Sequence, residues 1–240
     1  MFAPAATRLL VFGATGKTGI RVVERAVARG WAVSTFVRSP ARLPEALRSK
    51  VHVIVGDVND AAAVSAAVAS ETPSIMLDAT SALPFGHAKG APANTADRSI
   101  LLRAAVGELA AKGRLGSCYF VMVGGQLVPE PGGTINTTFA WAIEWALRVV
   151  VARRAWATVG EAIAWLFAQP PEFRFTMLRM GQLSDVPSRG PLAVESTAGG
   201  NYPRTDVSYE DVADAIMALA EAGNGPRACY LNYPVAVAPA

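Results

Sequence analysis

The sequence predicts an α/β fold organised around a doubly wound parallel sheet, and three observations support this prediction. Short apolar runs of strand type alternate with segments in which apolar residues recur at helical spacing. A turn containing three glycines joins the first strand to the first helix, and the length of 240 residues suits one domain. Because β-α-β connections place strands parallel and helices on both faces, we expect a single domain over residues 1–240. Residues 181–206 are expected to contribute a small C-terminal lobe.

The first unit of this fold, residues 8–38, is the most informative. Residues 9–12 form a short apolar strand, and residues 20–27 carry apolar side chains at helical spacing. Gly30 ends this helix, and a second strand is expected over residues 31–37. The strand–turn–helix–strand order is that of the first half of a Rossmann-type dinucleotide-binding fold.

The glycines of the turn follow the spacing GxxGxxG, at Gly13, Gly16 and Gly19. A tight turn at Gly13 needs a residue without a Cβ, and Gly16 lets backbone N–H groups approach a pyrophosphate closely. Gly19 lets the helix pack against the strand. The helix N-terminus then directs free N–H groups and the positive end of its dipole at the phosphates. An ordinary glycine-rich turn is the alternative interpretation.

The end of the second predicted strand indicates which dinucleotide is preferred. NAD-binding units usually carry Asp or Glu there, which accepts from the ribose 2′-hydroxyl. Here the strand ends in Arg38, with Ser39 and Arg42 close behind and no acidic residue. A guanidinium suits a 2′-phosphate, so we predict NADP(H) as the cofactor. The alternative is that Arg38 is a solvated surface residue.

The third predicted strand, residues 51–55, leads into two carboxylates. Asp57 follows this strand, and a carboxylate at that position can reach the amino group of an adenine. Alternatively, Asp57 or Asp60 caps the next helix, expected over residues 61–69. The two roles are compatible if each aspartate takes one of them.

The fourth predicted strand, residues 74–79, leads into Thr80 and Ser81, and then into a loop over residues 82–94 that contains His87. Ligands of doubly wound sheets bind outside the carboxyl ends of the strands. We therefore place these three side chains near the nicotinamide half of the cofactor, as weak candidates for catalysis. The competing interpretation of His87 is an exposed loop histidine.

The rest of the chain continues the alternation of strands and helices. Helices are expected over residues 40–47, 94–112, 139–169 and 212–222, and strands over residues 117–123, 173–180 and 228–233. Gly124 and Gly125 end the fifth strand, and the loop over residues 126–138 could form part of a substrate pocket. Residues 181–205 read as loop, and Ser208 with Asp211 forms a capping box for the last helix.

The helix over residues 139–169 has an unusual composition. Arginines lie between its four tryptophans, which are Trp141, Trp145, Trp156 and Trp165. A stripe of this kind could line a pocket for a flat substrate. The simpler interpretation is a core helix with one solvated face.

Composition excludes several functional classes. The net charge of +3 is small and the basic residues are scattered, which argues against nucleic-acid binding. The two cysteines form no motif, so we expect a reducing, cytoplasmic location and no metal site. We see no signal-peptide pattern and no apolar run long enough to span a membrane, since residues 139–151 contain Glu144 and Arg148.

Several segments resemble the atypical short-chain dehydrogenase/reductases, in particular the NmrA-like and biliverdin-IXβ/flavin-reductase-like group. Residues 13–19 match the GATGxTG loop of that group. The other matching segments, which extend the resemblance over residues 8–216, are Val37-Arg38 ("VR"), 56–58 ("GDV"), 120–125 ("VVGG"), 175–181 ("TxLRPG", with Met180 in place of Pro) and 207–213 ("ISxxDVA"). The resemblance and the glycine unit together imply contacts to the cofactor from Gly13, Thr15, Gly16, Lys17, Thr18, Gly19, Arg38, Asp57, Val58, Ala79, Thr80, Ser81 and Gly124.

The sequence departs from this family at the usual catalytic residues. Typical short-chain dehydrogenases use a Tyr-xxx-Lys pair, in which Tyr exchanges a proton with the substrate oxygen and Lys lowers its pKa. The helix over residues 139–169 contains neither Tyr nor Lys. The serine expected at the end of the fifth strand is replaced by Gly124 or Gly125. The usual machinery for carbonyl reduction is therefore missing.

Two functional hypotheses follow. The first is an NADPH-dependent reductase that transfers hydride to a flat acceptor such as a flavin or quinone, for which alignment of cofactor and acceptor suffices. The second is a non-catalytic NADP(H)-binding redox sensor, or an accessory subunit with a protein partner. A biosynthetic isomerase or reductase with a specialised small-molecule substrate is not separated from the first by sequence.

Overall fold

A computed structural model describes residues 7–80, 97–125, 153–181, 183–196 and 207–232. Its main sheet has eight strands in the order β3-β2-β1-β4-β5-β6-β10-β8, and β8 alone pairs antiparallel. These strands are β1 (Arg8–Phe12), β2 (Ala32–Val37), β3 (His52–Val55), β4 (Ile75–Asp78), β5 (Tyr119–Gly125), β6 (Phe175–Met180), β8 (Ala193–Ser196) and β10 (Ala228–Asn232). The order 3-2-1-4-5-6 confirms the predicted doubly wound α/β fold.

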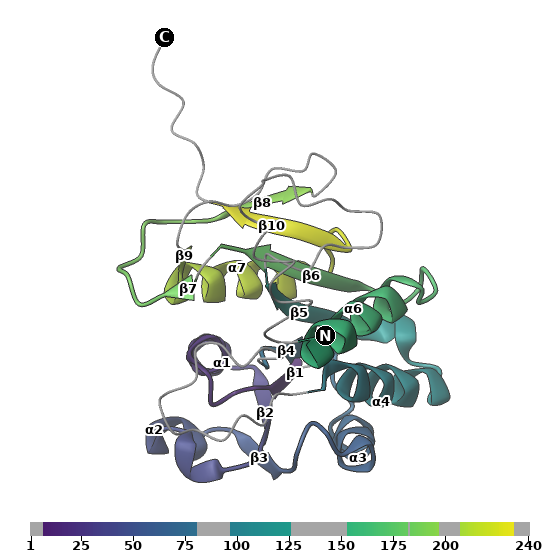
Figure 1. The fold of residues 1–240 in the computed structure, drawn as a ribbon. Coiled ribbons are helices and arrows are strands. Elements are labelled where there is room, and N and C mark those ends of the chain that lie inside the picture. The colour runs from purple at the N-terminus through teal and green to yellow at the C-terminus, as the bar shows by residue number, and fades with distance from the viewer. Residues whose placement is uncertain (1–6, 81–96, 126–152, 182, 197–206, 233–240) are drawn as a thin grey trace, which may run out of the picture.

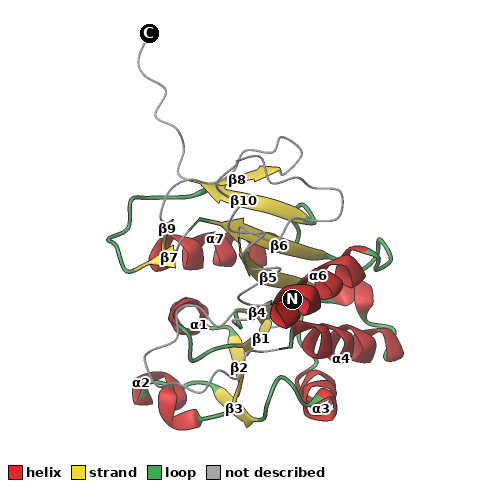
Figure 2. Cartoon of the chain, viewed as in Figure 1, coloured by secondary structure: helices red, strands yellow, loops and turns green. Residues whose placement is uncertain are grey.

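Helices cover both faces of the sheet (Figures 1 and 2). One face carries α1 (Lys17–Ala28), α2 (Glu45–Arg48) and α7 (Tyr209–Ala222), and the other carries α3 (Ala61–Glu71), α4 (Arg98–Ala111) and α6 (Arg153–Phe167). Alternate residues of each strand face opposite helices. Leu10, Phe12 and Phe36 therefore belong to the core under α3, α4 and α6, whereas Leu9 and Val11 belong to the core under α1 and α7. No helix in the described ranges is both long and apolar enough to cross a membrane.

The observed element boundaries differ from the predicted ones in a few places. The predicted helix over residues 40–47 is two pieces, a 3-10 turn at Pro40–Arg42 and α2, because Pro44 interrupts it. Another 3-10 turn lies at Leu115–Ser117. The stretch predicted as loop over residues 181–205 contains β8 and also β7 (Leu183–Ser184), which pairs with β9 (Val207–Ser208) in a second, two-stranded sheet.

Two of the predicted helix caps are confirmed. The Asp60 side chain accepts from the N–H groups of Ala62 and Ala63 at the start of α3. The Ser208 hydroxyl accepts from the N–H groups of Glu210 and Asp211 at the start of α7. Both helices therefore begin where the sequence provides an oxygen acceptor for their free N–H groups.

Helices α1 and α7 are joined by a ladder of ion pairs. Basic residues at every fourth position of α1 face acidic residues that lie on α7 or follow β7. We call this set the α1–α7 ladder, and its members are Lys17, Arg21, Arg25 and Arg29 with Asp185, Glu210, Asp214 and Glu221.

Thr72, which ends α3, has a left-handed backbone with φ of +43°. Cβ-branched residues avoid this region, and glycine is the usual residue at such helix ends. We expect Thr72→Gly to raise the free energy of unfolding by about 1 kcal/mol and the melting temperature by about 3 °C. Thermal unfolding followed by circular dichroism measures this. A lower melting temperature would mean that the threonine side chain contributes more than the strain costs.

Candidate functional site

The carboxyl ends of the parallel strands meet at one edge of the sheet. The strand register pairs Phe12 with Phe36 of β2 and with Asp78 of β4, and pairs Asp78 with Met122 of β5. The segments that leave these strands therefore lie side by side, which brings Gly13, Arg38, Asp57, Ala79, Thr80 and Gly124 to the same edge. This is the edge at which doubly wound sheets bind their ligands.

The three glycines of the first turn have different environments. Gly13 has φ of +83°, and a Cβ there would lie 2.6 Å from the carbonyl carbon of Ala79. A Cβ on Gly19 would lie 2.3 Å from the carbonyl oxygen of Gly13, so this glycine allows α1 to touch the turn. A Cβ on Gly16 would come no nearer than 3.3 Å to any atom named for it, its φ is −83°, and the residue is exposed. The protein itself therefore requires Gly13 and Gly19, but not Gly16.

A buried ion pair holds the strand ends beside this turn. Asp78 is 0% exposed and Arg98 is 5% exposed, and Arg98 Nε lies 3.2 Å from Asp78 Oδ2. The guanidinium also donates through Nη2 to the carbonyl of Thr80 and, at 2.7 Å, to the carbonyl of Val123. Arg98 thus joins the end of β4 to the end of β5 from the first turn of α4.

The same carboxylate fixes Thr80. Asp78 Oδ1 accepts from the Thr80 N–H at 2.9 Å and from the Thr80 hydroxyl at 2.6 Å. Because the hydroxyl proton is directed at Asp78, the free lone pairs of Thr80 Oγ1 remain to accept a hydrogen bond from a ligand. The geometry thus suits Thr80 to accepting a hydrogen bond from a ligand.

The ends of β2 and β3 carry the residues predicted to bind the adenosine half. Arg38 is exposed directly after β2. The Asp57 carboxylate accepts from the N–H of Asn59, and the Asn59 side chain accepts from the N–H of Asp97 at the start of α4. Since Asp60 caps α3, Asp57 is left for the contact to the adenine, which stays a prediction.

Lys17, predicted as a cofactor contact, is directed at Asp185 in the structure. Its Nζ forms an ion pair with the Asp185 carboxylate, and Arg21 Nη2 lies 3.4 Å from the other oxygen. The hydrogen bond to Asp185 raises the pKa of Lys17, and the hydrogen bond to Lys17 lowers the pKa of Asp185. Both groups therefore stay charged near neutral pH.

Other predicted residues are only partly covered by the structure. Ser81, His87, Trp141 and Trp145 lie outside the described residues. Trp165 packs against the core beneath α6, and the Arg103 guanidinium lies 5.1 Å from its ring centre. This tryptophan therefore follows the simpler interpretation of a core helix.

The cysteines and the acidic residues offer no alternative chemistry in the described ranges. Burial raises the pKa of the Cys118 thiol and of the Cys229 thiol to about 12, so both stay protonated and unreactive. In the same ranges, no group of three or more His, Cys, Asp or Glu side chains could hold a metal ion.

The sequence did not predict the two buried residues that hold the strand ends in place at the site. Asp78 ends an apolar strand, and Arg98 lies on a helix with apolar neighbours. The available signal was a charged residue beside apolar ones in each segment, because charges that are buried are usually paired. Asp185 carried no comparable signal, since it lies in a segment that reads as loop.

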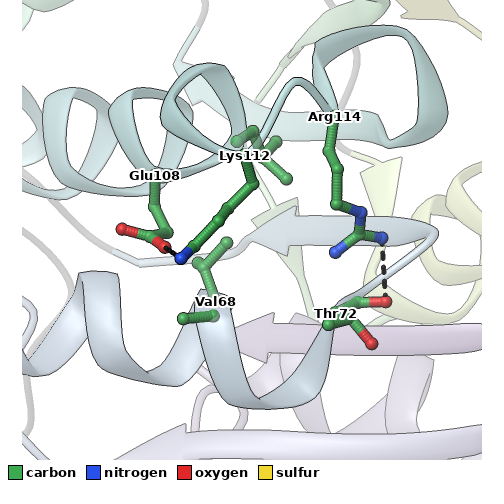
Figure 3. Close-up of a pocket in the computed structure, with 7 residues that line it drawn as sticks. Val68, Thr72, Glu108, Lys112 and Arg114 are labelled. Carbon is green, nitrogen blue, oxygen red and sulfur yellow. Dashed lines mark hydrogen bonds and ion pairs between the residues drawn. The ribbon is translucent and has the colours of Figure 1, made fainter.

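Two hollows lie at the opposite, amino end of the sheet. One has a volume of about 270 Å³ between the ends of α3 and α4, where Arg114 donates to the carbonyl of Thr72 at 3.1 Å (Figure 3). The other, about 460 Å³, lies beside the first residues of β1, β2 and β3. Both hollows therefore lie at the end of the sheet away from the glycine turn.

Comparison with known proteins gives a consistent picture. A family model described as NAD(P)H-binding matches residues 13–222. The structure resembles an anaerobillin reductase, ChuY, from Escherichia coli O157:H7, with a TM-score of 0.67 and 23% identity over 98% of this chain and 100% of that one. It also resembles a candidate NADH-flavin reductase from Streptococcus pneumoniae, with a TM-score of 0.62 and 17% identity over 95% of this chain and 100% of that one.

A curated relative matches over a shorter stretch. A 3-diazoavenalumate denitrifying reductase from a Streptomyces species is 42% identical over 76 residues. This alignment covers 32% of the present chain, and the chain spans only about a quarter (24%) of that relative's length.

Proposed function

Because the chain belongs to the NAD(P)H-binding family, we propose that it is an NADPH-dependent reductase that transfers hydride to a flat acceptor such as a flavin or a quinone. The observation that carries this proposal is the glycine turn, where Gly16 is exposed at the carboxyl edge of the sheet and an added Cβ would meet only the Gly13 carbonyl oxygen, at 3.3 Å. Space there suits a pyrophosphate at the N-terminus of α1. The reductases among the similar proteins support hydride transfer as the reaction.

In the proposed complex, the nicotinamide supplies the hydride and the protein aligns the two reactants. The backbone of the glycine turn and the N-terminus of α1 would hold the pyrophosphate. Thr80, fixed by Asp78, would accept a hydrogen bond from the nicotinamide half. Since the Thr80 hydroxyl already donates its proton to Asp78, the proton for the reduced acceptor would come from water.

Arg38 would select NADPH over NADH. The residue is exposed at the end of β2, where its guanidinium can reach a 2′-phosphate. We expect Arg38→Glu to weaken NADPH binding by at least about tenfold and NADH binding by less than about twofold, because only NADPH loses a charged partner and gains repulsion. Fluorescence titration of each cofactor measures both constants. Equal losses of affinity for NADPH and NADH would contradict the prediction that the cofactor is NADP(H).

The second candidate function is a non-catalytic NADP(H)-binding sensor, or an accessory subunit with a protein partner. The observation that favours it is the composition of residues 139–169, which include neither Tyr nor Lys. Both candidates are compatible with a reducing, cytoplasmic location, which the free thiols of Cys118 and Cys229 support. Both also retain one domain, with residues 181–206 as a small lobe.

Turnover separates the two candidates. Purified protein is mixed with NADPH and a panel of flavins and quinones, and oxidation of NADPH is followed at its nicotinamide absorbance, with a protein-free control for each acceptor. Oxidation above the control with one acceptor class supports the reductase. Tight NADPH binding in a parallel titration without oxidation would favour the sensor, and absence of binding would contradict both.

A further inference from the structure

A short segment joins the C-terminal part of the chain to the glycine turn. We call residues 183–190 the strap. It begins at β7, shortly after β6 reaches the carboxyl edge of the sheet, and it leads towards β8. Its first residues are held in place by β9, because Leu183 pairs with Val207 and Ser184 with Ser208.

Two carboxylates fasten the strap, and they differ in burial. At its far end, the Asp211 side chain accepts from the Ser188 hydroxyl and from the Arg189 N–H, and Asp211 is 2% exposed. At its near end, the Asp185 side chain is 51% exposed and contacts Lys17 and Arg21. The Asp211 contact therefore belongs to the core of the fold, whereas the Asp185 contact lies where solvent and ligands can reach it.

The Asp185 contact is made to the part of α1 that would face the cofactor. Lys17 is the first residue of α1 and directly follows Gly16. The side chains of Lys17 and Arg21 both lie over the ring of Tyr209, at 5.2 and 5.4 Å from its centre, and Arg21 also donates to Glu210. One cluster thus joins the glycine turn, the strap and the start of α7.

We propose that Asp185 is a positioning residue that couples the strap to the glycine turn, so that a bound cofactor fixes the strap, which forms the first part of the small lobe proposed for residues 181–206 and would contact the acceptor. This inference rests on the proposed function. Lys17 then serves to hold Asp185, and the backbone of the turn holds the pyrophosphate. Because the ion pair is exposed, its effect is modest and is weakened by salt.

Amide hydrogen exchange in the strap tests the coupling directly. We expect NADPH to slow exchange of residues 183–190 in the unmodified protein. At least half of this slowing should be lost in Asp185→Asn, which removes the charge but keeps the shape. Asp185→Glu keeps the charge and should retain the slowing of exchange. Glu221→Gln is the matched control, because Glu221 forms an exposed ion pair with Arg29 at the other end of the same helix pair.

Kinetics provide the second readout, with the acceptor that the unmodified protein reduces. We expect Asp185→Asn to raise KM for this acceptor about threefold, leave the NADPH dissociation constant within about 1.5-fold, and remove the salt dependence of KM. Glu221→Gln should change none of these.

Three outcomes are distinguishable. If the unmodified protein does not bind NADPH, the proposed function fails. If NADPH binds but slows exchange in the strap equally in Asp185→Asn and the unmodified protein, the coupling is contradicted. The proposed role of Lys17 in holding Asp185 also fails if Lys17→Gln weakens NADPH binding tenfold, since Lys17 would then be a phosphate ligand.

Discussion

Replacing Gly16 with valine is expected to abolish NADPH binding while the protein stays folded. The backbone at Gly16 has φ of −83° and ψ of 163°, a conformation that valine adopts readily. The nearest atom to an added Cβ is the Gly13 carbonyl oxygen at 3.3 Å, a contact that a small shift relieves. The added methyl groups would occupy the space proposed for the pyrophosphate. We expect the dissociation constant to rise at least about 100-fold, or about 2.7 kcal/mol.

Two further glycine variants give this prediction its controls. Gly107→Val places the same side chain within α4, where no atom outside the local helix backbone lies within 4 Å of the added Cβ, and it should leave NADPH binding unchanged. Gly19→Ala forces a Cβ to within 2.3 Å of the Gly13 oxygen, so it should lower the melting temperature as well as the affinity. Unaltered NADPH affinity in Gly16→Val would contradict the assignment of the glycine turn to the pyrophosphate.

Arg98→Met should cause a large loss of stability. The substitution leaves the fully buried Asp78 carboxylate without its cation, and removing one partner of a buried pair costs about 3–5 kcal/mol. It also leaves the carbonyls of Thr80 and Val123 without this donor. For a chain of this length we expect the melting temperature to fall by about 10 °C, measured by thermal unfolding together with urea unfolding.

Arg103→Met is the matched control for this change. Arg103 lies on the same helix, is exposed, and contacts Ser99 and the ring of Trp165, so its loss should cost less than about 1 kcal/mol. The double variant Asp78→Asn/Arg98→Met removes both charges and should recover part of the lost stability. If Arg98→Met melts like Arg103→Met, the buried pair does not hold the strand ends as described.

The features that sequence predicted well are local. A run such as residues 9–12, a glycine at Gly30 and an oxygen acceptor at Ser208 each act on backbone within a few positions, so their spacing alone reveals the strand, the helix end and the cap. The family resemblance extended this local information into an ordered set of strand ends, and the strand order follows from the topology of such folds.

The features that sequence did not predict depend on residues far apart in the chain. Asp185 and Lys17 are separated by 168 positions, and nothing near Asp185 indicates its partner. The pairing of Asp78 with Arg98 joins a strand to the helix that follows it. The sequence alone does not show that both side chains are buried, and burial is what requires them to pair. For the glycine turn, by contrast, the sequence already assigned close packing to Gly19, and the structure adds which atoms this glycine touches.

The α1–α7 ladder has a consequence for how the chain reaches its folded state. It joins the first helix to the last one, and the pair between Arg21 and Glu210 spans 189 positions. During synthesis, α1 leaves the ribosome long before α7 has been made. Its apolar face and its row of four cations are therefore exposed to solvent until α7 is available. Contacts between segments so far apart in the chain form slowly, because the loop between them must close first. A polypeptide cut before residue 209 would leave the apolar face of α1 without its cover from α7, so we expect it to be less stable than the whole chain.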